Sequence, residues 1–147
     1  MAFKLNISDN GKAWKLESDG ESLIGKSLGD KIEGVEIGKE LEGYDLEITG
    51  GSDIAGFPMY DEAAGIGLKK VLLKKGWGMH DPREGVRLRK TVRGKTISNL
   101  IAQINLKVLK IGKKPLIEIF PEQNKPKVKE KKVVKNELTE IAPTLSA

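Results

Sequence analysis

ITGGSD, at residues 48–53, begins a segment that ends at Gly94 and carries most of the information in this sequence. Four further pieces follow in order: GFPM (56–59), GIG (65–67), KKVLLKKG (69–76) and RLRKTVRG (87–94). Glycine is frequent and irregularly spaced here, which favours tight turns and close backbone approaches over a helix. Residues 69–95 contain ten lysines and arginines but only two acids, a net charge of +8. A basic segment bent by glycines is typical of a surface that lies against phosphates.

Apolar and polar residues alternate on both sides of this segment, which predicts strands there, and within it the apolar stretch 68–73 with its lysine pairs predicts another strand. The turn Asp9-Asn10-Gly11 should join the first two strands, because an Asn-Gly pair tolerates positive φ. Trp14 alternates with Leu16 in the second strand, so we expect it to pack in the core or at its rim. Between the strands, we expect a long functional loop and then an excursion without a clear period. The predicted strands are 2–8, 12–17, 44–49 and 68–73, and the two irregular stretches are 50–67 and 76–89.

The C-terminal part of the pattern leaves one alternative open. Residues 97–104 have the three- and four-residue spacings of a helix, whereas alternation from Gln103 onward favours a strand. Residues 116–120 predict a last strand. Glycines interrupt every short segment between 22 and 38, which suits the tight corners of a small barrel. The expected fold class is therefore mainly β, a small closed β-barrel over residues 1–120 with basic loop excursions.

The composition changes after Phe120. Residues 121–135 contain two prolines and six lysines and little that could build a core. Such a composition is typical of a disordered arm, or of one that a partner orders. We therefore expect residues 121–147 to form a flexible, lysine-rich C-terminal tail.

Charge and composition exclude several classes of protein. Residues 1–65 carry a net charge of −8 and residues 66–147 a net charge of +13, which suggests one face turned toward a polyanion. The chain has no cysteine, so disulfides and thiolate metal sites are excluded. The sequence shows neither a signal peptide nor a long apolar run. A cytoplasmic protein without a membrane partner is expected.

Enzymatic interpretations find little support. His80 is the single histidine, so it cannot belong to a histidine cluster that binds a metal, and the triple Ser52-Asp53-His80 lacks a nucleophile elbow. The glycine-rich loop does not have the spacing of a P-loop or a dinucleotide fingerprint. We interpret that loop as structural, with glycines for positive φ and Ser52 or Asp53 bonding nearby amides; its residues are Gly50, Gly51, Ser52, Asp53 and Gly56. No catalytic residue, metal, cofactor or small-molecule substrate is expected.

The basic stretch is the better candidate for a functional site. In an extended conformation, Arg87, Arg89 and Arg93 would point to one side, and a guanidinium can pair with two phosphate oxygens or stack on a base. Trp77 and His80 lie within the same positive region, an interleaving that is typical of RNA binding. For Trp77 two interpretations stay open, stacking on RNA or packing on its own fold.

The joint order of these pieces resembles the S-six-e family of small-ribosomal-subunit proteins of archaea and eukaryotes. FKLNI at 3–7, the residues LIGK at 23–26 with Gly29, Asp30 and Gly34, and INL at 104–106 add to the resemblance, which covers about the first 115 residues. The chain is more similar to the short archaeal members, because it carries no serine cluster of the kind found in the long eukaryotic C-terminal helix. The eukaryotic regulatory role is therefore not transferred.

The resemblance implies a structural constituent of the small ribosomal subunit that supports translation. It implies a monomer within the particle, with small-subunit ribosomal RNA and neighbouring ribosomal proteins as partners. The alternative is a free RNA-binding β-barrel factor in translation or RNA processing. By residue type and by the resemblance, the expected RNA contacts are Lys69, Lys70, Lys74, Lys75, Trp77, His80, Arg83, Arg87, Arg89, Lys90, Arg93 and Lys95.

Overall fold

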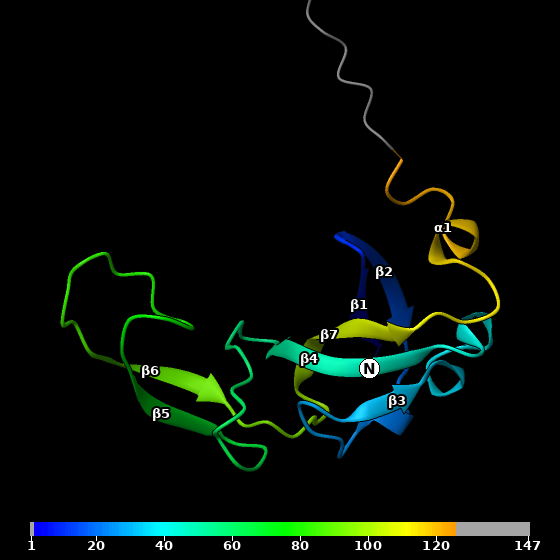
Figure 1. The fold of residues 1–147 in the computed structure, drawn as a ribbon. Coiled ribbons are helices and arrows are strands. Elements are labelled where there is room, and N and C mark those ends of the chain that lie inside the picture. Colours follow the sequence, from blue (N-terminus) through cyan, green and yellow to red (C-terminus); the bar gives the residue numbers. More distant parts are fainter. Residues whose placement is uncertain (1, 126–147) are drawn as a thin grey trace, which may run out of the picture.

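The fold is mainly β and contains two sheets (Figure 1). The computed structural model describes residues 2–125, so the predicted tail lies outside the described residues from residue 126 onward. The larger sheet has the strand order β2-β1-β7-β4-β3, and the smaller sheet is the antiparallel hairpin β5-β6. The strands are β1 (Phe3–Asp9), β2 (Lys12–Ser18), β3 (Lys31–Glu33), β4 (Asp45–Asp53), β5 (Leu68–Leu73), β6 (Leu88–Arg93) and β7 (Ile101–Lys110).

The expected closed barrel is wrong. In the described residues the five-stranded sheet ends at β2 on one edge and at β3 on the other, and these edges do not pair. The reason lies in the glycine-interrupted segment that follows β2. It forms three short 3-10 turns and a three-residue strand, so it offers no strand long enough to join the edges. The turns are η1 (Glu21–Leu23), η2 (Gly34–Glu36) and η3 (Lys39–Leu41).

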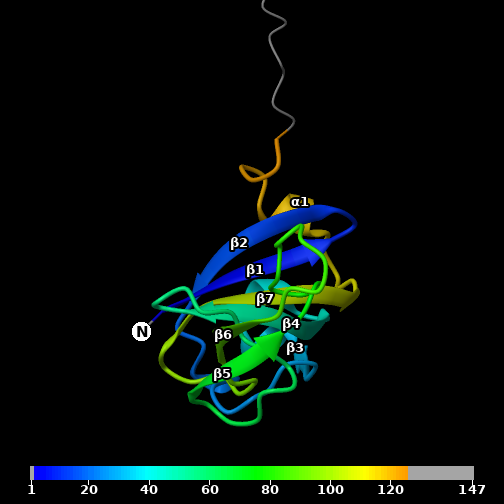
Figure 2. The ribbon, with the colours of Figure 1, turned by 90° about the vertical axis from the view of Figure 1, so that its left-hand side faces the viewer.

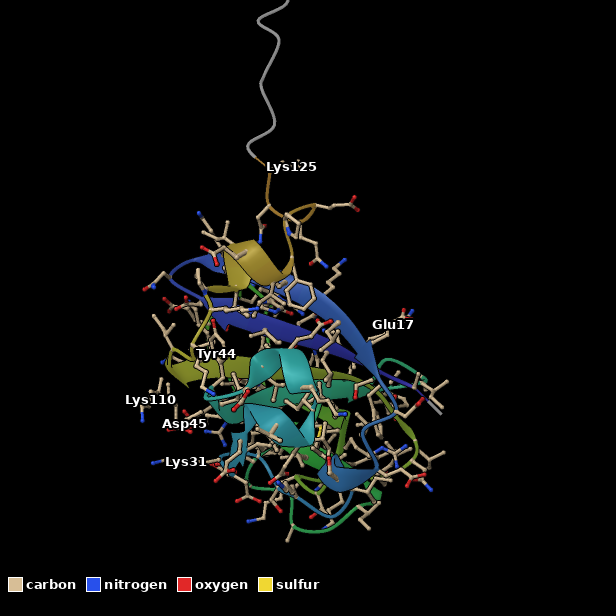
Figure 3. The ribbon with its side chains drawn as sticks, turned by 90° about the vertical axis from the view of Figure 1, so that its right-hand side faces the viewer. Glu17, Lys31, Tyr44, Asp45, Lys110 and Lys125 are labelled. Carbon is tan, nitrogen blue, oxygen red and sulfur yellow. The ribbon has the colours of Figure 1, made fainter. Side chains whose placement is uncertain are left out.

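One face of the larger sheet carries the core. Alternate residues of the central strands point inward, including Ile7, Ile48 and Leu106, which are paired through their register across β1, β7 and β4. The 3-10 turns add Leu23 and Leu41 to the same cluster. Figure 3 shows the side where these turns cover the sheet, with charged residues such as Lys31, Asp45 and Lys110 at its rim. The interior therefore depends on aliphatic residues, as the sparse aromatic content requires.

The N-terminal hairpin confirms the prediction from alternation. β1 and β2 pair in the expected antiparallel register around Asn10 and Gly11, which have φ values of 46° and 77°. Trp14 lies on the inner face of β2 and is only 2% exposed, so its expected place in the core is also confirmed.

The region after β7 differs from the expectation. Residues 116–120 do not form a strand; Leu116–Ile119 is a single helical turn, α1, after Pro115. Leu116 is buried, and Ile119 and Phe120 pack beside the core. This spacing of three and four residues suits a helical turn, which a short apolar run does not distinguish from a strand. The helical alternative for 97–104 is also wrong, because β7 already begins at Ile101.

The glycine-rich loop starts later than expected. β4 continues through Gly50 and Gly51 to Asp53, with a bulge opposite β7 between Ile48 and Gly50. Neither glycine has a positive φ, so the expected positive φ is wrong for Gly50 and Gly51, whereas Gly56 has a φ of 90°. Gly51 is needed for a close approach instead: a Cβ there would lie 2.6 Å from the carbonyl oxygen of Gln103 and 2.9 Å from Sδ of Met59. The strand can therefore pass β7 only without a side chain at this position.

Gly51→Ala should lower the free energy of unfolding by about 1–3 kcal/mol, because β7 and Met59 must move to admit a methyl group. Gly50→Ala is the matched control, since the nearest atom to its Cβ would be Nδ2 of Asn105 at 3.8 Å. Urea denaturation of both variants measures the difference. Equal losses at the two positions would contradict the close-approach explanation.

Candidate nucleic-acid interface

Hairpin β5-β6 projects from one side of the larger sheet (Figures 1 and 2). Its register pairs Lys70 with Thr91 and Leu72 with Arg89. Directly opposed residues of an antiparallel pair share a face, so these four side chains lie on one side of the hairpin. The other side carries Leu73 and Val92, which are buried, and several further residues. The buried side also carries Lys69 and Lys90, so cations lie on both sides of the hairpin and the apolar contact with the core is made by Leu73 and Val92.

A short segment connects the hairpin to the larger sheet. Pro58 forms a bridge with Ser52 of β4, and Met59 forms a parallel bridge with Arg93 of β6. The amide of Met59 donates to the carbonyl of Gly51 at 2.9 Å. Residues 58–60, which were expected to be loop, are thus held between the two sheets and fix the place where the hairpin leaves the core.

Most of the predicted contact residues are accessible. The exposed ones are Lys69, Lys70, Lys74, Lys75, Trp77, His80, Arg83, Arg87 and Arg89. Lys90 and Lys95 are half-buried, and Arg93 is buried. The structure thus brings a dense set of exposed cations to one hairpin and its connection, and separates Arg93 from that set.

Arg93 forms a buried ion pair with Asp53. Its Nε and Nη2 atoms donate to Oδ2 of Asp53 at 3.2 and 2.9 Å, and its Nη1 donates to the carbonyl of Ile66 at 3.3 Å. The other oxygen, Oδ1, accepts the amide of Phe57 at 2.9 Å, which confirms the expectation that Ser52 or Asp53 would bond nearby amides. Burial alone would raise the pKa of Asp53, but the hydrogen bonds from Arg93 and Phe57 outweigh it and lower that pKa. Arg93 therefore joins the two sheets rather than facing outward.

Two other cations are partly engaged within the protein. Arg83 donates from Nε and Nη2 to the two carboxylate oxygens of Asp81, at 3.0 and 2.6 Å, which lowers the pKa of that carboxyl. Nζ of Lys90 donates to the carbonyl of Gly78 at 3.0 Å. These contacts hold the connection between β5 and β6 in shape. They leave the charges of Lys70, Arg87 and Arg89 without a hydrogen-bonded acid among the described residues.

Trp77 packs on its own fold, which is one of the two interpretations that the sequence left open. Its ring stacks on Tyr60 with a centroid distance of 4.7 Å and an interplanar angle of 26°, yet the residue is 49% exposed. Sequence reasoning missed Tyr60, because a single tyrosine after GFPM carries no local signal for a partner 17 positions further on. The pair places an aromatic surface beside Lys74, Lys75 and Arg87.

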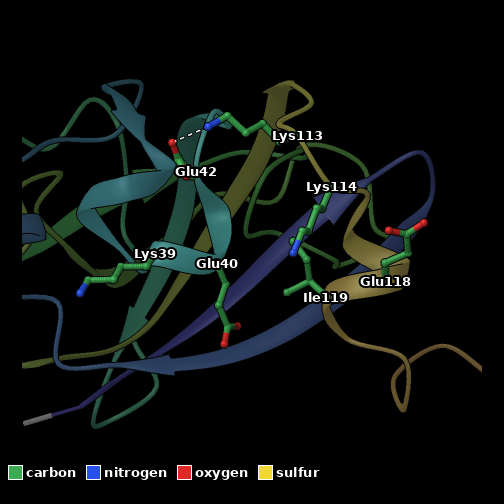
Figure 4. A pocket seen from close by; sticks show the side chains of 7 residues that line it. All are labelled: Lys39, Glu40, Glu42, Lys113, Lys114, Glu118 and Ile119. Carbon is green, nitrogen blue, oxygen red and sulfur yellow. Dashed lines mark hydrogen bonds and ion pairs between the residues drawn. The ribbon is translucent and has the colours of Figure 1, made fainter.

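Away from the hairpin, a depression of about 320 Å³ lies between η3 and α1 (Figure 4). Its walls carry three lysines and three glutamates, and Nζ of Lys113 donates to Oε1 of Glu42 at 2.6 Å. That hydrogen bond lowers the pKa of Glu42. Because the charges balance, this depression offers no net attraction to a polyanion. The hairpin is therefore the candidate interface.

Two other kinds of site find no support in residues 2–125. This part of the chain contains no group of three acidic or histidine side chains that could hold a metal ion. Within the same range, no helix has the length and hydropathy required to cross a membrane.

These features define a small, mainly β protein with an exposed cationic hairpin. The family model described as Ribosomal protein S6e matches residues 3–121, so the chain belongs to this family. The chain is 48% identical over 118 residues to the small ribosomal subunit protein eS6 of Methanococcus maripaludis, covering 79% of this chain and 94% of the relative. It is 42% identical over 128 residues to the protein of that name from Archaeoglobus fulgidus, covering 84% and 98%. The predicted resemblance is confirmed, and the family is one of structural ribosomal proteins rather than of enzymes.

Proposed function

We propose that this protein is a structural constituent of the small ribosomal subunit in the cytoplasm, where it supports translation. It binds ribosomal RNA through hairpin β5-β6 and the connection between its strands. The names of the archaeal relatives, each a small ribosomal subunit protein, support the assignment to the particle. The concentration of exposed cations on one hairpin supports the assignment of the RNA contact.

The single observation that carries the RNA contact is the separation of charges along the chain. Residues 1–65 have a net charge of −8, whereas residues 69–95 have a net charge of +8 and lie mostly on the surface. Each lysine or arginine that neutralises a phosphate releases counterions from the RNA. This release makes a large favourable contribution to the binding free energy at low salt. The acidic part would be repelled by RNA, so the protein should approach with the hairpin first.

The hairpin also has a physical reason to need a partner. Leu72, on the side that carries Lys70 and Arg89, and Leu88, at the start of β6, are both exposed. Ribosomal RNA would cover these side chains and remove their apolar surface from water.

Further partners follow from the same assignment. Neighbouring ribosomal proteins are expected to contact the faces that RNA leaves free, with this chain present as a monomer. No cofactor or small-molecule substrate is involved. Residues 1–120 would form the folded rRNA-binding domain, and the lysine-rich residues 121–147 would serve as a basic arm that contacts RNA. The start of this arm lies against β2, where Gln123 and Asn124 form hydrogen bonds with the backbone of Lys15 and Ala13.

The test replaces four exposed cations of the hairpin, Lys70, Lys74, Arg87 and Arg89, with glutamine in the full chain. Arg93 is left intact because it is buried against Asp53. If all four contact phosphates, the slope of log affinity against log salt should flatten by about 3 units. Binding to a fragment of small-subunit rRNA across a salt series measures the slope, and circular dichroism checks the fold.

The matched control replaces Lys4, Lys12, Lys15 and Lys39, which are also exposed but lie in the acidic part of the chain. These changes should alter the slope much less. Equal flattening in both variants would mean diffuse attraction, and flattening in neither would overturn the RNA interface. Co-sedimentation with small subunits tests the alternative function. If the protein dissociates from the subunits already at low salt, it is a free RNA-binding factor rather than a constituent of the particle.

A further inference from the structure

A depression of about 560 Å³ lies where β5 passes into the connection toward β6. Its walls include Tyr60, Leu72, Lys74, Lys75, Trp77 and Arg87. We propose that it binds one unstacked nucleotide of RNA, with the base against Trp77 and a phosphate between the cations. This inference rests on the proposed function and names the kind of RNA element that the interface selects. The volume lies within the range of about 300–1,000 Å³ that is common for small-ligand sites.

The aromatic pair provides the stacking surface. Tyr60 covers part of Trp77 at a centroid distance of 4.7 Å, and Trp77 remains 49% exposed, as expected when one face of an indole is covered and the other is open. Unpaired bases stack on such faces whatever their sequence. A base inside a duplex cannot do so, because its own neighbours already cover it. The site therefore fits a looped-out or single-stranded nucleotide.

Trp77 is held in place before RNA arrives. It lies between Gly76 and Gly78, whose φ values are 141° and 69°, and the amide of Met79 donates to the carbonyl of Gly76 at 3.2 Å. Met79 is buried, and Lys90 holds the carbonyl of Gly78. A side chain presented on a turn that is anchored on both sides loses little conformational entropy when a base binds.

The charges of the depression suit a nucleotide rather than a neutral ligand. Lys74, Lys75 and Arg87 are all exposed at its walls and can reach a phosphate. The one acid in the wall, Glu62, accepts a hydrogen bond from the Tyr60 hydroxyl at 2.9 Å. That hydrogen bond, together with burial, raises the pKa of Tyr60. Three cations against one acid leave a net positive site.

The experiment compares Trp77→Ala with Trp77→Phe in the full chain. The probes are a short single-stranded RNA and the duplex that it forms with its complement. Trp77→Ala should weaken single-strand binding by about 5- to 150-fold. Trp77→Phe keeps a ring and should lose much less, and neither change should alter duplex binding, which depends on the phosphates. Trp14 is buried, so quenching of tryptophan fluorescence by the single strand should report Trp77 and disappear in Trp77→Phe.

The outcomes separate this site from the interface around it. Suppose that Trp77→Ala binds single-stranded RNA as well as the parent protein does, while the fourfold glutamine variant shows a flatter salt dependence. This result would overturn the nucleotide site and leave the proposed function standing. Equal weakening for single strand and duplex would also overturn it, because Trp77 would then only maintain the shape of the connection. If the glutamine variant keeps its salt slope and Trp77→Ala keeps its affinity for the single strand, both the nucleotide site and the proposed RNA interface are overturned.

Discussion

Asp53→Ala is expected to lower the free energy of unfolding by about 3–5 kcal/mol, because it leaves a guanidinium buried without its partner. The side chain of Arg93 is 9% exposed and that of Asp53 1%, and the distance from Nη2 to Oδ2 is 2.9 Å. The same carboxylate also accepts the amide of Phe57. One substitution therefore removes hydrogen bonds from both the hairpin and the segment that follows β4.

Asp81→Ala is the matched control, since it removes a similar carboxylate–arginine contact at the surface. The side chain of Arg83 is 73% exposed, and exposed pairs contribute about 0–1 kcal/mol. Urea denaturation of both variants measures the difference. The double variant Asp53→Leu with Arg93→Met, which leaves no buried charge, should recover much of the loss. Similar small losses for Asp53→Ala and Asp81→Ala would show that the buried pair does not join the sheets.

The same pair predicts how stability depends on pH. The pKa of Asp53 in the folded state lies below the ordinary value of 3.8. Its contribution is therefore fully present above about pH 4 and is lost as the pH falls through the folded pKa. Asp53→Asn should remove this part of the acid dependence. Acid titration monitored by circular dichroism would show a shallower loss of stability in the variant than in the parent protein.

Gly34→Ala is expected to cost about 3 kcal/mol or more. A Cβ at this position would lie 2.0 Å from the carbonyl oxygen of Leu41 and 2.9 Å from its Cβ. Leu41 is fully buried, and the amide of Gly34 donates to the carbonyl of Tyr44 at 2.7 Å. The clash therefore falls on the backbone that connects η2 and η3 to the core, where little movement is available.

Gly38→Ala tests whether glycine is required throughout this segment or only at Gly34. Gly38 has an extended backbone, with φ at −176°, and no described atom lies within 4 Å of where its Cβ would be. Thermal unfolding of the two variants should show a large loss for Gly34→Ala and a small change for Gly38→Ala. Equal losses would point to a requirement for chain flexibility instead of space.

Strands that are encoded by a pattern of a few consecutive residues were predictable from the sequence. β1 and β2 follow from alternation and from the Asn10-Gly11 turn, and β5 follows from a short apolar stretch with lysine pairs, because these signals lie within a few positions of one another. The closed barrel was wrong because closure depends on whether two distant edges meet. Residues 116–120 were assigned wrongly because a short apolar run fits either period.

The candidate site shows the same division. Charge density along the chain was enough to locate the cationic hairpin, and the exposure of Lys70 and Arg89 agrees with that location. The sequence did not show that Arg93 turns inward to Asp53, 40 residues away, or that Tyr60 supports Trp77. Both contacts depend on how residues 58–60 pass between the sheets, and no local pattern encodes that path.

The position of β7 has a consequence for how the chain folds. β7 lies between β1 and β4, and it pairs in parallel with β1, so Asn6 meets Asn105 across the sheet at a separation of 99 residues. Contacts between such distant residues slow folding, because the intervening chain must lose entropy before they form. During synthesis, the edges of β1 and β4 that pair with β7 have no hydrogen-bonding partner until β7 has been made. The last strand of the sheet is thus its central one, and the nascent chain remains open to wrong strand pairing until about residue 110 is available.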